Sequence, residues 1–443
     1  MARFTAALLR GTIVGALGGF LFGYDTVVIS GATAQLTQVF LLSPASLGVT
    51  VSIALWGTVA GCLLAGWLGT RLGGRNALRV MATLYVVSAV GCALAWSWPT
   101  LLVFRLIGGL GIGGSSVLGP VYISELAPAA WRGRLVGTFQ MMVVTGILIA
   151  YVANWHIARL GLGAAEWRWQ LGAAGFPACL FFVMLYTIPH SSRFLISRNN
   201  IGPALRVLQQ MGITDSDGEL KLIRASLAGD AANSQKRLFK RSLRLPIMLA
   251  ITIGVFNQLS GINAILYYAN DIFTAAGLSR LSSFSQSIYI GVANLLATIL
   301  GMSLIDRIGR KTLLLIGAAG TMCCLFTVGV IFQTRSYLAS LVWVLIGFIA
   351  FFAVSQGAVI WVYISEVFPT SVRSKGQSLG SLSHWLMNAV IAGLFPIVAA
   401  RLSPAIPFYL FAIAMLVQLI VVANLYPETK GKSLERLQIE LQR

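Results

Sequence analysis

Charged residues are scarce in this sequence. Asp, Glu, Lys and Arg make up only 10% of its 443 residues, whereas a soluble domain usually has about a quarter. So few charges cannot cover a surface that faces water, and the mean hydropathy of +0.83 points the same way. The composition therefore excludes an ordinary soluble domain and favours a protein that lies in a lipid bilayer.

Residues that bind metals or catalyse reactions are also few. The three histidines, His156, His190 and His384, lie far apart in the sequence. The five cysteines fall in apolar segments, without the spacing of metal ligands or of a disulfide framework. The stretch "TKGKS" near the C-terminus lacks the upstream glycine of a phosphate-binding loop. We therefore expect no enzyme, no metal, no cofactor and no ATPase, so energy must come from gradients.

Long apolar runs fill most of the chain. Twelve of them have at least the ~18 residues needed to cross a hydrocarbon core about 30 Å thick. They are too long and too uniformly apolar for the strands of a barrel. The runs are roughly 12–34, 47–69, 78–96, 100–124, 135–157, 168–188, 246–274, 284–305, 312–332, 338–364, 377–399 and 405–426. We predict an all-α membrane protein with twelve transmembrane helices.

The net charge of +19 lies mostly on one side of these segments. If the N-terminus is inside, 26 of the 32 Lys and Arg residues lie on inside connections and five on outside ones. This is the positive-inside bias of membrane proteins, so the charge indicates orientation and not nucleic-acid binding. The first segment is too long for the apolar core of a signal peptide. We predict a multi-pass plasma-membrane protein with both termini in the cytoplasm.

Several motifs occur twice, in the same order. "YISE" begins at residues 122 and 363, "TRLGGR" at residue 70 matches "DRIGRK" at residue 306, and a proline followed by basic residues closes each half. Such repeats are typical of secondary transporters. We predict two pseudo-symmetric six-helix bundles, 1–188 and 246–427, joined by a cytoplasmic linker with short helices at 189–245 and followed by a tail at 428–443.

Acidic and basic residues stand at the inner ends of the repeated helices. A carboxylate and a guanidinium at that boundary are partly desolvated and can pair. We expect such pairs, with Glu125 and Glu366 beside arginines, to hold the inner side closed; the alternative is that they only anchor helix ends. The expected gate residues are Arg71, Glu125, Arg132, Arg307, Glu366 and Arg373.

Two ionised residues lie well inside predicted helices. Asp25 and Arg105 are both about 9 Å from the outer edge of their helices, counted at the rise of an α-helix. An isolated charge at that depth costs at least about 2.5–3.5 kcal/mol on insertion scales, so the two are expected to pair. The pair is either a proton switch, in which Asp25 takes a proton on separation, or a static ion pair.

With that pair accounted for, no charge remains at mid-depth for an anionic substrate. The helices carry amides and aromatic rings, which suit sugar hydroxyls and the apolar face of a sugar ring. The same amides can also join helices to one another. These residues are Gln140, Asn257, Gln258, Asn263, Asn294, Gln356, Asn388, His384, Trp361 and Trp385. We expect a neutral substrate.

Motifs along almost the whole chain resemble those of the sugar porters of the major facilitator superfamily, most of all the proton-coupled xylose symporters of bacteria. They include "GGFLFGYDTVVISG", "RLIGGLGIG", "YISELAPAAWRGR", "NQLSGINAILYYA", "DRIGRK", "YISEVFP" and "PETKGKSLE". The resemblance implies a secondary active transporter that imports a neutral monosaccharide, a pentose or a hexose, by proton symport with alternating access. It also implies that Asp25 is the proton-coupling group.

The resemblance further implies which residues bind sugar. They are Phe22, Gln140, Gln258, Asn263, Tyr267, Asn294, Trp361, Trp385 and Asn388. The chain departs from the family pattern near this site at Asn257, Gln356, Ala358 and His384, and at the gate at Thr70, Gly74, His190 and Ser374. We count His384 among the expected sugar-binding residues because it stands beside Trp385.

Two other transport-related functions remain open. A passive sugar uniporter is the nearest, and Asp25 is the feature that separates it from a symporter. A sugar sensor on a transporter scaffold is the other, but such proteins usually add a long cytoplasmic tail. We expect a monomer in the bacterial inner membrane whose partners are a monosaccharide, protons and lipid.

Overall fold

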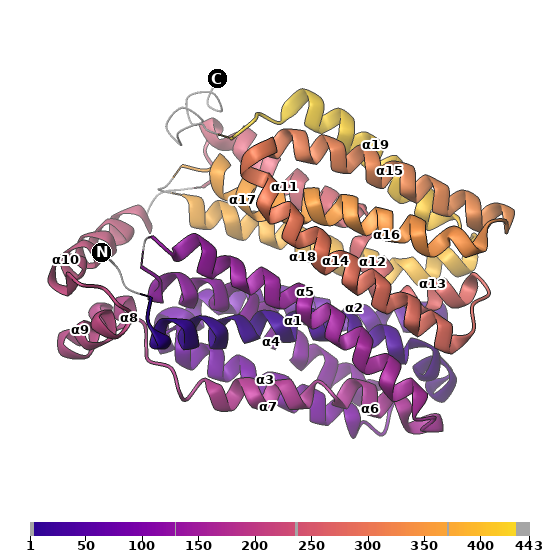
Figure 1. Ribbon diagram of the computed structural model, residues 1–443, viewed down its shortest axis with the longest axis horizontal. Coiled ribbons are helices and arrows are strands. Elements are labelled where there is room, and N and C mark those ends of the chain that lie inside the picture. The colour runs from indigo at the N-terminus through magenta and orange to yellow at the C-terminus, as the bar shows by residue number, and fades with distance from the viewer. Residues whose placement is uncertain (1–3, 129, 235–237, 370–371, 431–443) are drawn as a thin grey trace. The chain divides into compact units, whose positions relative to one another are not determined.

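The structure is a computed structural model that describes residues 4–128, 130–234, 238–369 and 372–430. Within these ranges every regular element is a helix and none is a β-strand (Figure 1). The prediction of an all-α protein is confirmed.

Eleven stretches of the described chain are long and apolar enough to cross a membrane. Nine are single helices: α1 (Ala6–Phe40), α2 (Pro44–Leu72), α3 (Gly74–Ala93), α4 (Trp98–Leu126), α5 (Arg132–Arg159), α14 (Arg280–Ile308), α15 (Arg310–Thr334), α18 (Arg373–Arg401) and α19 (Ile406–Leu425). The other two are composite: α11 (Arg244–Leu259) with α12 (Ile262–Tyr267), and Leu338–Val367, which holds α16 (Leu341–Phe352), a π-helical turn (Ala353–Gly357) and α17 (Ala358–Val367).

The predicted span at 168–188 forms two shorter helices, α6 (Glu166–Gly172) and α7 (Gly175–Met184). Pro177 lies in the first turn of α7 and has no N–H for the carbonyl one turn earlier, so the hydrogen-bond ladder is interrupted there. Ala173 and Ala174 between the helices keep right-handed helical angles. The two helices together therefore follow the course predicted for one.

The predicted span at 246–274 is also divided. Gly261 has a φ of 79° and separates α11 from α12, and the membrane-crossing stretch ends at Tyr267. Beyond it lies α13 (Ala269–Ala275). A left-handed residue costs little only when it is glycine, which is why the helix breaks at this position.

The chain folds as two compact units. The first takes in α1 up to Val28, Ile53–Ala153, and the chain from Gly163 to the end of α10. The second takes in Ile29–Ser52, Asn154–Leu162 and the chain from α11 onward. These boundaries cut through α1, α2 and α5, and the division of the chain at 189–245 stays a prediction.

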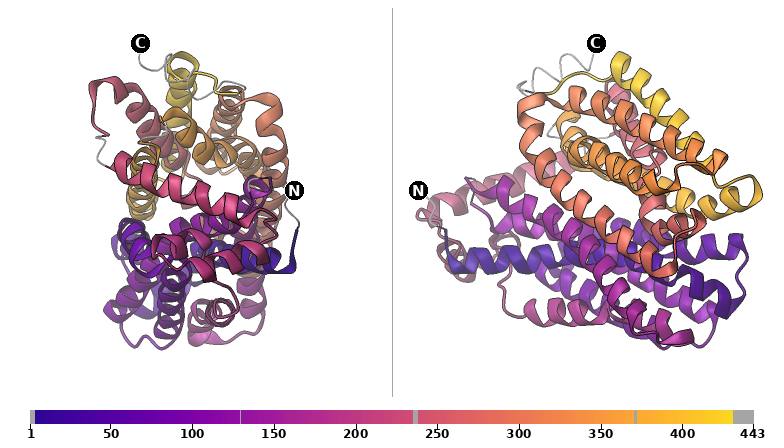
Figure 2. Two further views of the ribbon diagram at one scale, coloured as in Figure 1. Left: turned by 90° about the vertical axis from the view of Figure 1, so that its left-hand side faces the viewer. Right: turned by 45° about the vertical axis from the view of Figure 1, so that its right-hand side comes forward.

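Short helices follow α7 in the first unit. They are α8 (Ser192–Ser197), α9 (Ile201–Gln210) and α10 (Ser216–Ser234), whose ribbons Figure 2 shows from two further sides. They pack around a small core of Ile196, Ala204 and Leu220. The hydroxyl of Thr5, just before α1, donates to the carbonyl of Gln210 at 2.8 Å. The linker therefore contains helices, as predicted, and its second helix is held at the start of α1.

Glycine allows the long helices of the first unit to approach closely. A Cβ on Gly109 of α4 would lie 1.9 Å from the Ala54 carbonyl oxygen of α2, and one on Gly57 of α2 would lie 2.3 Å from the Leu106 carbonyl oxygen. No side chain fits in that space. The stretch "GLGIGG" at 109–114 thus serves helix packing, as small residues often do between membrane helices.

Candidate functional site

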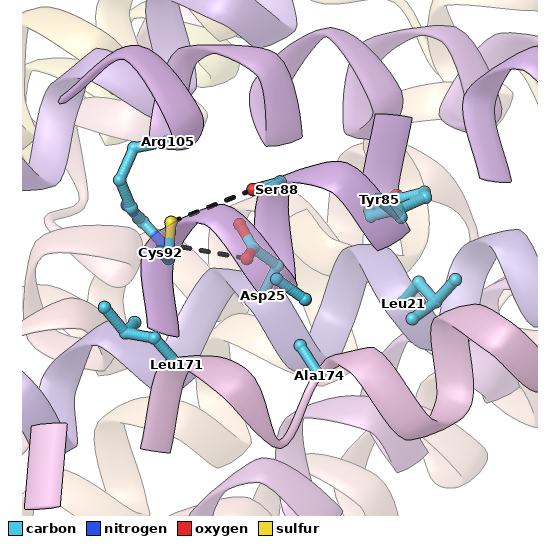
Figure 3. Close-up of a pocket in the computed structure, with 9 residues that line it drawn as sticks. Leu21, Asp25, Tyr85, Ser88, Cys92, Arg105, Leu171 and Ala174 are labelled. Atoms are coloured by element: carbon cyan, nitrogen blue, oxygen red, sulfur yellow. Dashed lines mark hydrogen bonds and ion pairs between the residues drawn. The ribbon is translucent and has the colours of Figure 1, made fainter. Parts of the chain in front are cut away.

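Asp25 of α1 and Arg105 of α4 form an ion pair inside the first unit (Figure 3). Arg105 Nη1 lies 3.6 Å from Asp25 Oδ1, and the two side chains are 4% and 16% exposed. That distance exceeds the 2.7–2.9 Å of a charge-assisted hydrogen bond. Arg105 Nε is buried and has no hydrogen-bond partner among the described residues. The predicted pairing is confirmed, but as an ion pair without a direct hydrogen bond.

A small cavity of about 10 Å³ adjoins this pair, room for about one water molecule. It is lined by Leu21, Asp25, Tyr85, Ser88, Ala89, Cys92, Arg105, Leu171 and Ala174 (Figure 3). The hydroxyl of Tyr85 lies 2.9 Å from Ser115 Oγ. Asp25 therefore lies against both polar and apolar side chains of the first unit. If it were separated from Arg105, no other cation among these lining residues would compensate its negative charge.

A cluster of amides and aromatic rings lies within the second unit. Gln258 connects some of its members, because its Nε2 donates to Asn257 Oδ1 at 3.0 Å and its Oε1 accepts from Asn263 Nδ2 at 3.0 Å. The same Nε2 is 3.3 Å from each ring nitrogen of His384. Tyr267 Oη and the side chain of Asn388 are joined at 3.0–3.2 Å. Three predicted sugar-binding residues, Gln258, Asn263 and His384, thus form one hydrogen-bonded group with Asn257, and two more, Tyr267 and Asn388, form a separate pair.

Aromatic rings form one side of this cluster. The ring centroids of Trp361 and His384 are 5.1 Å apart, and those of His384 and Trp385 are also 5.1 Å apart. Trp361 is half-buried, whereas His384 and Trp385 are buried. His384 therefore lies between two indoles, and the two tryptophans predicted to contact sugar are brought together through it.

Gly261 positions part of the cluster. It has left-handed angles, and a Cβ on it would lie 2.3 Å from the ring of Phe411. The break between α11 and α12 lets Gln258 end one helix while Asn263 and Tyr267 lie on the next. The predicted bend at this glycine is confirmed.

The remaining predicted sugar-binding residues lie elsewhere in the two units. Asn294 is buried on α14 in the second unit. Phe22 on α1 and Gln140 on α5 are half-buried members of the first unit. Gln356, one of the amides noted in the sequence, is buried in the π-helical turn and donates to Met415 Sδ at 3.3 Å, so its amide nitrogen is directed to α19.

At the repeated "YISE" of the second unit, the acid pairs with an arginine that is not among the expected gate residues. Glu366 accepts hydrogen bonds from Arg310 Nη2 at 3.0 Å and from Thr429 Oγ1 at 2.6 Å. Arg373, another expected gate residue, is the first residue of α18. Because Arg310 is the first residue of α15, the pair joins the end of one helix to the start of another.

In the first unit the predicted Glu125–Arg132 pair is not formed. Glu125 hydrogen bonds with the Ser191 side chain and lies near the charge of Arg193. Arg132 is exposed at the start of α5, because the chain leaves α4 in extended geometry at Ala127 before it turns. The acid therefore contacts the start of the linker and not the next helix.

The other expected gate arginines lie at the ends of α2 and α14. Arg71 is exposed, stacks at 4.6 Å over the ring of Trp67, and accepts a hydrogen bond at its carbonyl from Arg198. Arg307 is exposed in the last turn of α14. Neither guanidinium forms an ion pair that the described part of the chain records.

The sequence argument overlooked Glu428. Its Oε1 accepts from the backbone N–H of Arg310 and its Oε2 from that of Lys311, both at 3.0 Å. Burial raises the pKa of Glu428, but hydrogen bonds from the backbone of Lys430, Arg310, Lys311 and Thr429 outweigh this and leave the pKa below its usual value. The acid after the closing proline thus caps α15.

Asp271 was also overlooked, because it lies only three residues before the end of its predicted span. It is in the first turn of α13, and its Oδ1 accepts from Thr33 Oγ1 of α1 at 3.0 Å. Both residues belong to the second unit. The sequence argument considered only ionised residues well inside a predicted helix, and Asp271 is not one of them.

Comparison with known proteins gives one consistent result. The model of the family described as "Sugar (and other) transporter" matches residues 11–441. The arabinose-proton symporter of Bacillus subtilis is 36% identical over 429 residues, which are 95% of this chain and 92% of that protein. The D-xylose-proton symporter of Escherichia coli is 34% identical over 465 residues, covering 96% and 94%. The inward open structure of the xylose transporter XylE from E. coli matches with a TM-score of 0.88 at 33% identity, covering 98% and 99%.

Proposed function

Since this chain belongs to the sugar transporter family of the major facilitator superfamily, we propose that it is a secondary active transporter which imports a neutral monosaccharide by proton symport. The substrate is a pentose, as the names of the related arabinose and xylose symporters suggest, or a hexose, as the name of a related glucose transporter of Staphylococcus epidermidis suggests. The Asp25–Arg105 ion pair is the observation that carries the proton part of this proposal. We propose transport and not catalysis.

Proton coupling follows from the charges of that pair. Ionised Asp25 is attracted to Arg105, and protonation of Asp25 removes that attraction. Arg105 then remains as a buried cation, which is costly in this setting. A proton on Asp25 therefore changes which arrangement of α1 and α4 is most stable, and this links proton binding to a change of conformation.

Sugar binding is assigned to the amide and aromatic cluster. Gln258, Asn263 and Asn388 offer donors and acceptors to hydroxyls, and Trp361 offers an indole face. The cluster contains no ionised carboxylate or guanidinium, which supports a neutral ligand. Phe22 and Gln140 of the first unit stay predicted sugar-binding residues.

The gate is proposed to lie at the side of the membrane where the basic connections are. Glu366 with Arg310, and Glu125 with Ser191, hold helix ends at that side. We place this side, with both termini, in the cytoplasm because of the excess of Lys and Arg there. Alternating access follows if the bundles 1–188 and 246–427 open in turn to the two sides of a bacterial inner membrane, with the chain acting as a monomer.

Sugar counterflow in proteoliposomes tests the proposal. The purified chain is reconstituted and assayed with a panel of pentoses and hexoses, while the internal pH is recorded. We expect saturable exchange of at least one sugar and internal acidification during its net uptake. Exchange without acidification would identify a uniporter, and no exchange with any sugar would favour a sensor; either result overturns symport.

A further inference from the structure

Four polar residues from three helices, Ser30, Thr33, Asn270 and Ser287, lie around Asp271 in the second unit. The Asn270 side chain donates to the Ser30 carbonyl of α1 at 2.9 Å and accepts from Ser287 Oγ of α14 at 2.7 Å. Thr33 Oγ1 contacts both Asp271 Oδ1 at 3.0 Å and the Ser30 carbonyl at 3.3 Å. Ser30, Thr33 and Ser287 are at most 1% exposed. These contacts fix α13 against α1 and α14.

The carboxyl group is only half satisfied. Asp271 Oδ2 is buried and has no hydrogen-bond partner among the described residues, and neither has Ser30 Oγ. A buried carboxylate oxygen without a donor favours the protonated form, which carries one charge less. Part of Asp271 is nevertheless accessible to solvent, so a proton can reach it.

No cation compensates the carboxylate within the part of the chain that the structure describes. The titratable group facing it is Tyr268, whose hydroxyl donates to the Ala392 carbonyl at 2.9 Å. The elements packed against α13 present hydroxyls: Ser30 and Thr33 from α1, and Ser283 and Ser287 from α14. Burial raises the pKa of Asp271 to about 7, and the hydrogen bond from Thr33 opposes part of that rise.

The hydroxyl of Thr33 has one hydrogen and two acceptors near it. With Asp271 ionised, that hydrogen is shared between the carboxylate and the Ser30 carbonyl. With Asp271 protonated, the acid can donate to Thr33 Oγ1, and Thr33 is free to donate to Ser30. Protonation thus removes a buried charge while the contact between Asp271 and Thr33 is kept.

We propose that Asp271 is a second proton-binding site of this chain, separate from Asp25, and that its protonation fastens α13 to α1. Thr33 lies 27 residues along α1 from its first residue, about 40 Å away. Under the proposed orientation this is the outer side of the membrane. The inference rests on the proposed function: a proton taken up outside stabilises the closed outer side, and its loss loosens that side.

Hydrogen–deuterium exchange of the full chain in lipid nanodiscs tests the site without any sugar. We expect the peptide that covers α13 to lose protection as pH rises through neutrality, after correction for intrinsic exchange rates. Asp271→Asn is neutral at every pH, so α13 should stay protected throughout. Asp217→Asn removes an exposed acid of α10 and is the matched control, which should titrate as the wild type does.

Thr33→Val keeps the shape and the acid but removes the hydroxyl. Because that hydroxyl stabilises the charged form, the midpoint should move upward by about one pH unit, the size expected from one lost hydrogen bond. If Asp271→Asn does not fold, Thr33→Val alone tests whether Asp271 binds the proton. Identical pH profiles for wild type and Asp271→Asn, or an unmoved midpoint in Thr33→Val, would overturn the site.

The transport assay separates this inference from the function it rests on. Normal symport with an α13 that does not titrate overturns the second site alone. Titration of α13 as described, with no sugar transported, overturns symport and leaves the proton site in place.

Discussion

Tyr122 donates a hydrogen bond to the carbonyl oxygen of Pro189 at 2.7 Å. The same bond occurs in the second unit, where Tyr363 donates to the Pro427 carbonyl at 3.2 Å. Each tyrosine opens a "YISE" motif, and each proline closes its half of the chain. The tyrosine of each motif therefore connects the end of its helix to the chain that follows the last helix of the same half. The two halves differ at the residue after each proline.

Asp25→Asn should uncouple sugar from protons. The amide keeps the size of the acid but cannot take up a proton, so sugar-driven proton uptake should be abolished while sugar exchange remains measurable. Internal pH and labelled-sugar exchange, recorded on the same proteoliposomes, provide the two readouts. Asp217→Asn on the exposed face of α10 is the control and should leave both unchanged. Undiminished proton uptake in Asp25→Asn would rule out the switch.

The membrane spans and the ion pair were predictable because each rests on one strong physical rule. Apolar runs of sufficient length must form helices in lipid, and two isolated charges at similar depth must pair. The bend at Gly261 was also predictable, since glycine alone adopts its φ of 79° at low cost. These features depend on local sequence or on depth, and not on details of side-chain packing.

The helix-end contacts were not predictable in the same way. Glu366 has three arginines near it in the repeated motifs, and only the three-dimensional course of α15 selects Arg310. The contact of Asp271 with Thr33 could not be predicted, because the two residues are 238 positions apart in sequence. The break before α7 follows from Pro177. A proline near the start of a helix is usually tolerated, so the sequence alone did not show whether this one would divide the predicted helix.

Glu428→Gln should destabilise the second unit at neutral pH. The amide is a weaker acceptor for the N–H groups of Arg310 and Lys311, so we expect the free energy of unfolding to fall by about 1–2 kcal/mol. The pKa of Glu428 is lowered from 4.5, so its contribution is present above that pH and is lost as pH falls through the lower folded value. In detergent, the unfolding temperature of the variant should thus be lower than that of the wild type at pH 7, and this difference should disappear as pH falls below about 4.5. A gap independent of pH would contradict the capping role.

His190→Glu should strengthen the equivalent place in the first unit. His190 Nε2 lies 2.8 Å from Arg75 Nη2; burial, and then the charges of Arg75 and Arg79, lower the pKa of His190 to about 4, so the ring is neutral at pH 7. A carboxylate there should pair with Arg75 and cap α3, whose first turn has no side-chain cap. We expect the free energy of unfolding to rise by about 1 kcal/mol at low salt, and by less at high salt because the site is half-exposed.

The matched control for that gain is His190→Gln, which adds an acceptor without a charge and should leave the unfolding temperature near that of the wild type. If the charge also holds the inner side closed, sugar exchange by His190→Glu should be slower than by wild type. Equal unfolding temperatures for the glutamate and glutamine variants, at low and high salt, would show that the arginine gains nothing from a carboxylate.

Trp361→Ala should weaken sugar binding without altering proton coupling. Trp361 is half-buried beside His384, so its truncation removes an indole face that a sugar ring can cover. A loss of about 1.5 kcal/mol corresponds to a tenfold rise in KM. Trp343 of α16 is 71% exposed in the same unit, and Trp343→Ala is therefore the control for removing an indole. KM and the proton-to-sugar ratio, measured for both variants, should separate them: only Trp361→Ala raises KM, and neither changes the ratio. An equal KM in the two variants would place the sugar away from the aromatic cluster, because an indole that covers a sugar ring cannot be removed without a loss of affinity.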